Sequence, residues 1–404
     1  MIARGLLLGS LASRLGVLGF TALGVVLTTH ALGASGQGTI AILQLGMLIA
    51  GTINGMVAGG AVVHLQRTIP LRRMLVPGHV WLVLASLAVV TLEVVLGLIP
   101  LEKGLPVGVF AWLQGVVVFH GQIAIATQQF RWYNALQLVQ TGLLALGLTL
   151  AFGVLGIQRL EGFLGALAFA LGTTALVSLR LLRSLPHPDP AVPPPPLRRV
   201  LTTMASQGGI AQLGSLFQLL TQRLNVRLLS AWLPAGAGLA SAGLYSIAYL
   251  GMEAMWTLAR GWAPVVHGRI AHLPGPENRS ARLQLTRRVL LLTWASTLPL
   301  ALLASLLPDA WYAAVFHITG LQSVLRALLP AVLAGAGASI LAHHLSGIGA
   351  HAVNALTSAL GLAVMLACCA LWIPEHGAVG AAWAASVAGW AQFLGQAIAT
   401  LRRP

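Results

Sequence analysis

Side chains that could bind an anion lie inside an apolar stretch of the chain, residues 243–271. At 100° per residue, one face of a helix over this stretch carries Tyr245, Tyr249, Glu253, Trp256, Arg260 and His267. At ~1.5 Å per residue this face is about 33 Å long, close to the thickness of a bilayer core. We therefore expect a charged and aromatic stripe to cross a membrane here.

The other apolar runs add amides and arginines to this set. These further residues are Arg14, Gln218, Arg223, Asn225 and Arg227, with the glutamine and asparagine on one side of their helix and the two arginines of that run roughly opposite. Guanidinium groups bind phosphate bidentately and stay charged, so this set indicates a phosphate- or carboxylate-bearing ligand. Aromatic faces beside amides suit sugar rings or lipid. The pattern predicts an anionic, amphipathic ligand.

Each of these residues also has a purely structural interpretation. Arg14 could extend to the cytoplasmic surface. Arg223 and Arg227 could pair with Glu253 in a bridge between neighbouring helices. The tyrosines and the tryptophan could serve packing alone, and the amides could serve as hydrogen bonds between helices. Both interpretations stay open at this point.

Enzymatic chemistry is poorly supported by the sequence. The chain has 8 acids, Glu93, Glu102, Glu161, Asp189, Glu253, Glu277, Asp309 and Glu375, and no two have the spacing of a metal-binding or acid/base pair. No phosphate-binding G-x-x-x-x-G-K-[ST] loop occurs, and Cys368 and Cys369 are adjacent within an apolar run. We expect no enzyme activity, no cofactor and no metal site.

Composition places the chain in a membrane. It is 57% hydrophobic and 8% charged, whereas ordinary soluble domains carry roughly 25% charged residues. Most of its 23 Lys and Arg residues sit in short loops between apolar runs, which favours membrane topology over binding to nucleic acid.

Twelve apolar runs are long enough to span a bilayer. Their approximate limits are 8–32, 38–63, 75–99, 106–128, 133–155, 160–182, 203–231, 241–265, 287–308, 322–344, 351–373 and 377–399. Connections rich in arginine or histidine alternate with connections of little net charge, so both termini are predicted to be cytoplasmic.

Internal similarity divides these runs into two halves. Asn134-Ala135-Leu136 matches Asn354-Ala355-Leu356, and similar glycine-rich segments enter runs 160–182 and 377–399. The polyproline segment between the halves is typical of a semi-rigid spacer. We predict an all-α membrane protein with two six-helix lobes, residues 1–184 and 201–404, a cytoplasmic linker over 185–200, and a central cavity.

Four segments carry a resemblance to a known family: ALGASGQGTIAI, QQFRWYNALQLVQ, AGLYSIAYLGMEAMWTLARGWAPVVHGRIA and IPEHGAVGAAWAAS. In their order and spacing over essentially the whole chain, they resemble polysaccharide (Wzx-type) flippases of the multidrug/oligosaccharidyl-lipid/polysaccharide exporter superfamily. The resemblance implies a two-lobed transporter with a cationic cavity that moves polyprenyl-diphosphate-linked oligosaccharides by alternating access. Relatives commonly carry QRLD where this chain has QRLN at Asn225, so Glu253 and Glu93 become the candidates for ion coupling.

The resulting hypothesis is a flippase that moves a lipid-linked oligosaccharide from the cytoplasmic to the outer leaflet of a bacterial inner membrane for surface polysaccharide assembly, beside a glycan polymerase or glycosyltransferases. In it, Arg14, Arg223, Arg227 and Arg260 hold the diphosphate or acidic sugars, and Gln218, Asn225, Tyr245, Tyr249 and Trp256 contact the glycan. The alternatives are a drug/cation antiporter of the same superfamily, a membrane glycan polymerase or ligase, and a non-transporting scaffold.

Overall fold

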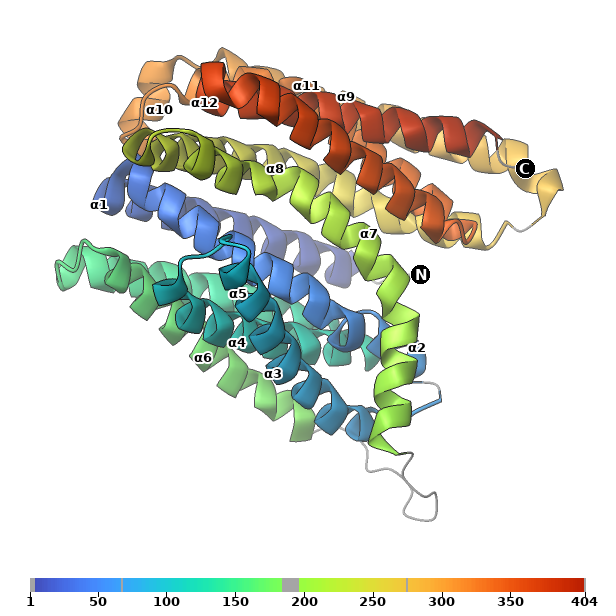
Figure 1. The fold of residues 1–404 in the computed structure, drawn as a ribbon. Helices are drawn as coiled ribbons and strands as arrows, with labels where there is room; N and C mark the ends of the chain where they lie inside the picture. The colour runs from blue at the N-terminus through green and yellow to red at the C-terminus, as the bar shows by residue number, and fades with distance from the viewer. Residues whose placement is uncertain (1–3, 67, 184–195, 274, 403–404) are drawn as a thin grey trace. The chain divides into compact units, whose positions relative to one another are not determined.

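The computed structural model describes residues 4–66, 68–183, 196–273 and 275–402, and within these ranges every regular element is a helix (Figure 1). The helices are α1 (Arg4–Ala58), α2 (Ala61–Leu65), α3 (Leu71–Val95), α4 (Leu101–Ala126), α5 (Phe130–Leu148), α6 (Leu160–Arg183), α7 (Leu197–Trp232), α8 (Ala235–Ala271), α9 (Arg279–Leu306), α10 (Asp309–Phe316), α11 (Leu321–Gly347) and α12 (His351–Arg402). A π-helical turn, Thr149–Val154, extends α5, and a 3₁₀ turn, Pro276–Asn278, precedes α9.

Two of the long helices are broken by a glycine. Gly33 in α1 has φ 66° and ψ −171°, and Gly377 in α12 has φ 51° and ψ −128°, conformations that side chains with a Cβ rarely adopt. Each of these helices therefore consists of two rods. The rods of α12 correspond to the predicted runs 351–373 and 377–399, whereas α1 ends at Ala58 and leaves the last residues of run 38–63 to α2.

Eight of the described helical segments are long and apolar enough to cross a membrane, and two of those, Ala12–Val63 and His351–Arg402, have 52 residues each. The helices α7 and α8 lie outside that set, with 36 and 37 residues. Together these helices supply twelve rods in the described part of the chain. The predicted all-α, multi-pass membrane fold with about twelve membrane helices is confirmed.

Contacts divide the chain into two compact units. The first contains the chain up to Leu32 and residues 42–212, and the second contains residues 33–41 and 213–404. The predicted linker over 185–200 falls mostly on 184–195, which lies outside the described residues, and α7 already begins at Leu197. The boundary between the two packed units therefore lies within α7, between residues 212 and 213, and so further along the chain than the predicted lobe boundary.

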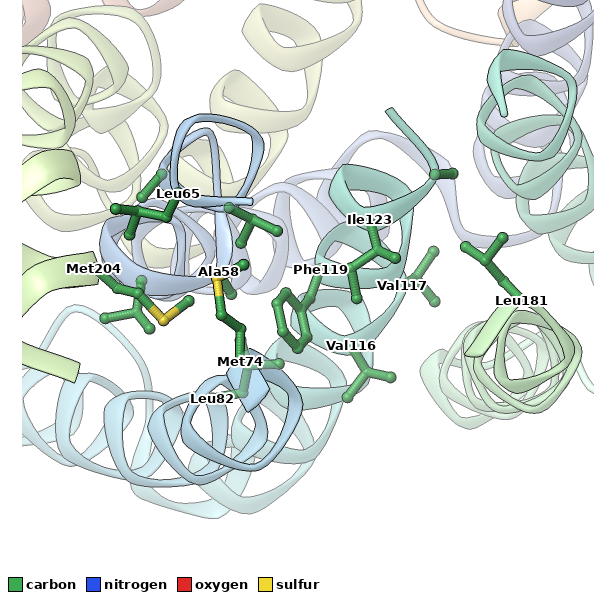
Figure 2. Close-up of a cluster of buried hydrophobic side chains, with 14 of the residues drawn as sticks. Ala58, Leu65, Met74, Leu82, Val116, Val117, Phe119, Ile123, Leu181 and Met204 are labelled. Atoms are coloured by element: carbon green, nitrogen blue, oxygen red, sulfur yellow. The ribbon is translucent and has the colours of Figure 1, made fainter. Parts of the chain in front are cut away.

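In the first unit, α4 packs against α3, α5 and α6. Figure 2 shows the buried cluster that joins these helices near one end, with Met74 and Leu82 from α3, Phe119 and Ile123 from α4, and Leu181 from α6. Phe119 is fully buried and lies directly against the backbone of Gly78, where an added Cβ would clash with its ring. This cluster fixes the axial register of α3 and α4.

In the second unit, α11 packs against α8, α9 and α12 (Figure 1). Small residues over 331–338 of α11 let these helices approach closely. Residues 33–41 join the same unit through Gly38 and Gly243, because a Cβ added to either glycine would overlap a backbone carbonyl oxygen of the other segment. The two backbones are thus in direct contact.

Candidate functional site

Arg223 on α7 and Glu253 on α8 form an ion pair inside the second unit. A guanidinium N–H of Arg223 donates to the Glu253 carboxylate, and the two side chains are 14% and 24% exposed. The same guanidinium lies 4.3 Å from the centre of the Tyr249 ring. Of the two roles that the sequence left open for Glu253, this conformation shows the partner of an α7 arginine.

Asn225 lies on α7 in a fully buried position. Its amide nitrogen donates to the Tyr245 hydroxyl at 2.9 Å and to the backbone oxygen of Ala381 at 3.2 Å, so it ties α7 to α8 and α12. An ionised aspartate has no hydrogen to donate to the Ala381 carbonyl. The amide therefore donates to the Ala381 oxygen at any pH, whereas an aspartate could do so only in its acid form.

Three aromatic residues of α8 form a continuous buried row. The ring centres of Tyr245 and Tyr249 are 6.0 Å apart, and Tyr249 meets Trp256 edge-on at 6.1 Å. The Trp256 indole donates to the backbone oxygen of Val332 at 2.8 Å and occupies space left open by Gly335. Both tyrosines are at most 1% exposed, so in this conformation they serve packing.

A polar cavity of about 320 Å³ lies within the second unit, between α7, α8 and α11. Its lining consists of Ser215, Gln218, Leu219, Gln222, Trp256, Gly335, Ser339 and His343. Amide, hydroxyl and imidazole groups are neutral hydrogen-bonding partners, and the Trp256 indole, whose N–H already donates to Val332, adds an aromatic surface. The volume is at the lower end of the range of small-molecule sites, roughly 300–1,000 Å³. The cavity can thus receive an uncharged polar group the size of a sugar.

Two of the predicted ligand-contacting residues, Gln218 and Trp256, line this cavity together. Its α11 wall was missed by the sequence interpretation. The signal was present, because Gly335, Ser339 and His343 recur at intervals of four and share one helix face. His343 donates its Nδ1 hydrogen to the Ser339 backbone oxygen at 2.8 Å, which leaves Nε2 as an acceptor.

Besides Arg223, the described structure shows the side chains of two more predicted arginines, Arg227 and Arg14. Arg227 donates to the Ser230 hydroxyl one turn further along α7, at 3.0 Å. Arg14 is exposed on α1 in the first unit. Arg260 belongs to residues 257–261 of α8, whose side chains lie outside the described part of the structure. Among the four, Arg223 is the one whose described contacts reach other predicted site residues.

Glu93 on α3 is the other predicted acid, and it lies in the first unit. Its side chain is 2% exposed, and neither carboxyl oxygen has a hydrogen-bond partner within the described residues. Its surroundings include Val90 and Ile99 of an apolar cluster, and Gly46 on α1 leaves room for one of its oxygens. Burial of an unpaired carboxylate costs several kcal/mol, so this environment accommodates the neutral acid.

Solved structures with this fold are membrane transporters. Over 99% of this chain and 88% of the other, the fold matches lipid II flippase MurJ in an inward closed conformation, with a TM-score of 0.74 and 12% identity. The MATE multidrug transporter DinF-BH matches over 99% and 94% of the two chains, at a TM-score of 0.69 and 13% identity. The Vibrio cholerae MATE transporter VcmN in the bent form matches over 99% and 97%, at a TM-score of 0.60 and 19% identity.

No protein-family model matches the sequence, and no curated protein matches it either. The likeness to MurJ and the MATE transporters is therefore one of fold.

Proposed function

We propose that this protein is an alternating-access flippase that carries a polyprenyl-diphosphate-linked oligosaccharide from the cytoplasmic to the outer leaflet of a bacterial inner membrane. The observation that carries the proposal is the neutral polar cavity beside Trp256, in a fold shared with a lipid II flippase. Amide and hydroxyl groups beside an indole face are suited to sugar hydroxyls and the apolar faces of sugar rings. A lipid-linked glycan for surface polysaccharide combines a sugar head group, which these side chains suit, with an anionic lipid.

Arg223 supplies the anion-binding part of this proposal. Its guanidinium is paired with Glu253 in the present conformation, and a diphosphate offers the same bidentate acceptor geometry as a carboxylate. Cargo binding would exchange Glu253 for phosphate as the acceptor of Arg223, and Glu253 would then take up a proton or another cation in place of the arginine. Arg14, Arg227 and Arg260 remain the further candidates for the diphosphate or acidic sugars.

The proposal includes a topology and a set of partners. Both termini are cytoplasmic, in accord with the basic connections at alternate loops. The glycan polymerase or glycosyltransferases of surface polysaccharide assembly would use or supply the cargo. Glu93 and Glu253 stay the candidates for ion coupling.

A drug/cation antiporter is the second candidate function, and two observations favour it. MATE transporters share the fold, and Glu93 is a buried acid of the kind that a cation exchange site requires. The lining of the second-unit cavity favours the flippase, because none of its side chains is an acid.

Deletion of the gene in its native cell separates the two functions. The flippase predicts loss of surface polysaccharide and accumulation of its lipid-linked precursor, with unchanged sensitivity to cationic dyes. Raised dye sensitivity with intact surface glycan would identify the antiporter instead. Covalent glycan product formed by the purified protein from a lipid-linked donor would reverse the non-enzyme expectation.

A further inference from the structure

Two histidines and a serine form a hydrogen-bonded chain across three helices of the first unit. His79 is on α3, His120 on α4 and Ser178 on α6. The Nε2 atoms of the two imidazoles are 3.2 Å apart, and His120 Nδ1 lies 2.5 Å from the Ser178 hydroxyl oxygen. His120 and Ser178 are both fully buried.

The contact of His79 with the backbone determines which nitrogens of the two imidazoles carry hydrogen. His79 Nδ1 lies 2.8 Å from the backbone oxygen of Leu75, and a carbonyl oxygen can only accept, so this nitrogen carries a hydrogen. In neutral His79, Nε2 then has a lone pair. His120 must therefore donate from its own Nε2 to make the 3.2 Å contact.

Ser178 makes this arrangement sensitive to one proton. Its hydroxyl oxygen lies 2.6 Å from the backbone oxygen of Ala175 as well as 2.5 Å from His120 Nδ1. The hydroxyl has a single hydrogen. If that hydrogen goes to Ala175, Nδ1 of His120 must donate to the serine, and a ring that donates from both nitrogens is an imidazolium. The contacts of His79 with Leu75, of His79 with His120, of His120 with Ser178 and of Ser178 with Ala175 therefore exist together only when these side chains hold one additional proton.

The side chains around these three residues are mainly apolar or basic. The chain borders the apolar cluster of Figure 2, where the His79 ring meets Phe119 edge-on at 5.3 Å. The ionisable residues toward this end of the helices that pack against α4 are Arg72 and Arg73 on α3, Arg131 and Tyr133 on α5, and Arg180 and Arg183 on α6, with His64 on α2. The acids of these helices, Glu93, Glu102 and Glu161, all lie toward the opposite ends. A proton on the pair thus has no carboxylate from these helices beside it to hold it permanently.

We propose that His79, His120 and Ser178 form a proton-binding site that takes up one proton per protein molecule. The proton sets the direction of the hydrogen bond between Ser178 on α6 and His120 on α4. Histidine is the side chain that most commonly exchanges a proton near neutral pH, and burial moves that exchange toward lower pH. The site is separate from Glu93, which lies 14 residues further along α3, about 21 Å at 1.5 Å per residue. Use of this proton to drive transport rests on the proposed function, whereas proton binding itself does not.

The experiment is a titration of the full-length protein, labelled with ¹⁵N-histidine, in lipid nanodiscs between pH 3 and pH 8, with EDTA and with measurement of bound zinc. We expect the nitrogen signals of His79 and His120 to shift together at one midpoint, with uptake of one proton. His120→Gln should abolish this step, and His376→Gln, at an exposed residue of the second unit, should leave it unchanged.

Ser178→Ala removes a single hydroxyl and is the variant that most directly tests the hydrogen-bond accounting. Loss of a hydrogen bond to a charged group should lower the midpoint by roughly one to two pH units. An unchanged midpoint in Ser178→Ala, or ring nitrogens of the wild type that do not shift over this range, would overturn the proposal. Stoichiometric zinc whose removal is needed before the pair titrates would also overturn it, in favour of a metal site.

A transport assay on the same preparation separates this inference from the proposed function. Flipping of a lipid-linked oligosaccharide without a histidine titration would leave the flippase standing and remove the proton site. A histidine titration in a protein that moves no such cargo would do the reverse.

Discussion

Arg223 contacts both Glu253 and the Tyr249 ring, so this one guanidinium stabilises the second unit and, in our proposal, also binds the diphosphate. Arg223→Ala removes the ion pair with Glu253, which should cost about 1–3 kcal/mol for a pair that is only partly buried. Surface glycan export should fall at least tenfold. Thermal denaturation of the purified protein and quantification of exported glycan are the two measurements.

The double variant Arg223→Ala/Glu253→Ala separates the two roles. Removal of both charges should restore most of the lost stability, because the carboxylate that lost its arginine is then absent as well. Export should stay low, because the ligand for phosphate is still missing. Full recovery of export in the double variant would show that the pair is purely structural.

Asn225→Asp tests whether this position requires a hydrogen-bond donor. An aspartate can reproduce the bond to the Ala381 oxygen only when protonated, so the folded state favours its acid form. Stability relative to the wild type should be retained near pH 4 and lost as the pH rises toward 8, by about 1–3 kcal/mol for an unsatisfied buried group. Melting curves at several pH values measure it, with Asn225→Leu as a variant that shows no such pH dependence. A constant difference between pH 4 and pH 8 would contradict this account.

At the scale of helices, Gly38 and Gly243 determine how residues 33–41 pack on α8. A Cβ at Gly38 would overlap the backbone carbonyl oxygen of Leu239, and the backbones would have to separate. Gly38→Ala should destabilise the protein by about 1–3 kcal/mol, the usual cost of overpacking. Gly236→Ala is the matched control, because an added Cβ there meets nothing within 4 Å. Equal melting temperatures for the two variants would disprove the close contact.

Asp309 caps α11 from the preceding helix, α10. Its carboxylate accepts backbone N–H groups of Gly320 at 2.7 Å and Gln322 at 3.1 Å, and these bonds hold the pKa of Asp309 below its ordinary value of 3.8. The stabilisation is therefore present at neutral pH and is lost as the pH falls below about 4. Asp309→Ala should cost about 1 kcal/mol at pH 7, as for other helix caps.

The measurement is the difference in melting temperature between wild type and Asp309→Ala across pH 3 to pH 7. The difference should narrow only at the acid end of this range. A difference that is independent of pH would show that the carboxylate charge does not contribute.

Sequence patterns predicted the helices well, because a membrane run is a composition signal that needs no tertiary information. The break at Gly33 falls between the runs 8–32 and 38–63, and the break at Gly377 falls on the first residue of run 377–399. The close contact of Gly38 with α8 was not foreseen, since it depends on which backbones meet in space. The periodicity of a helix shows which residues share a face, but it does not show which other helix that face contacts.

At the scale of the whole molecule, the same distinction explains what happened to the predicted site. The sequence identified Gln218, Trp256, Arg223 and Glu253, and the structure brings the first two into one cavity and the last two into one ion pair. It also buries Asn225 and Tyr245 against each other, away from that cavity's lining. Whether such residues are buried depends on the angles at which helices pack, and the pattern of residues on a single helix does not determine those angles.

The most direct test of the flippase is the rate at which purified protein in liposomes moves a fluorescent polyprenyl-diphosphate-linked oligosaccharide between leaflets. The wild type should accelerate this movement well above protein-free liposomes. The double variant Gln218→Ala/Gln222→Ala should be slower by about tenfold or more, since each lost hydrogen bond is worth about 1 kcal/mol, while Gln158→Ala, at an exposed residue outside the cavity, should match the wild type. A folded wild-type protein that leaves the rate at the protein-free level would contradict the account.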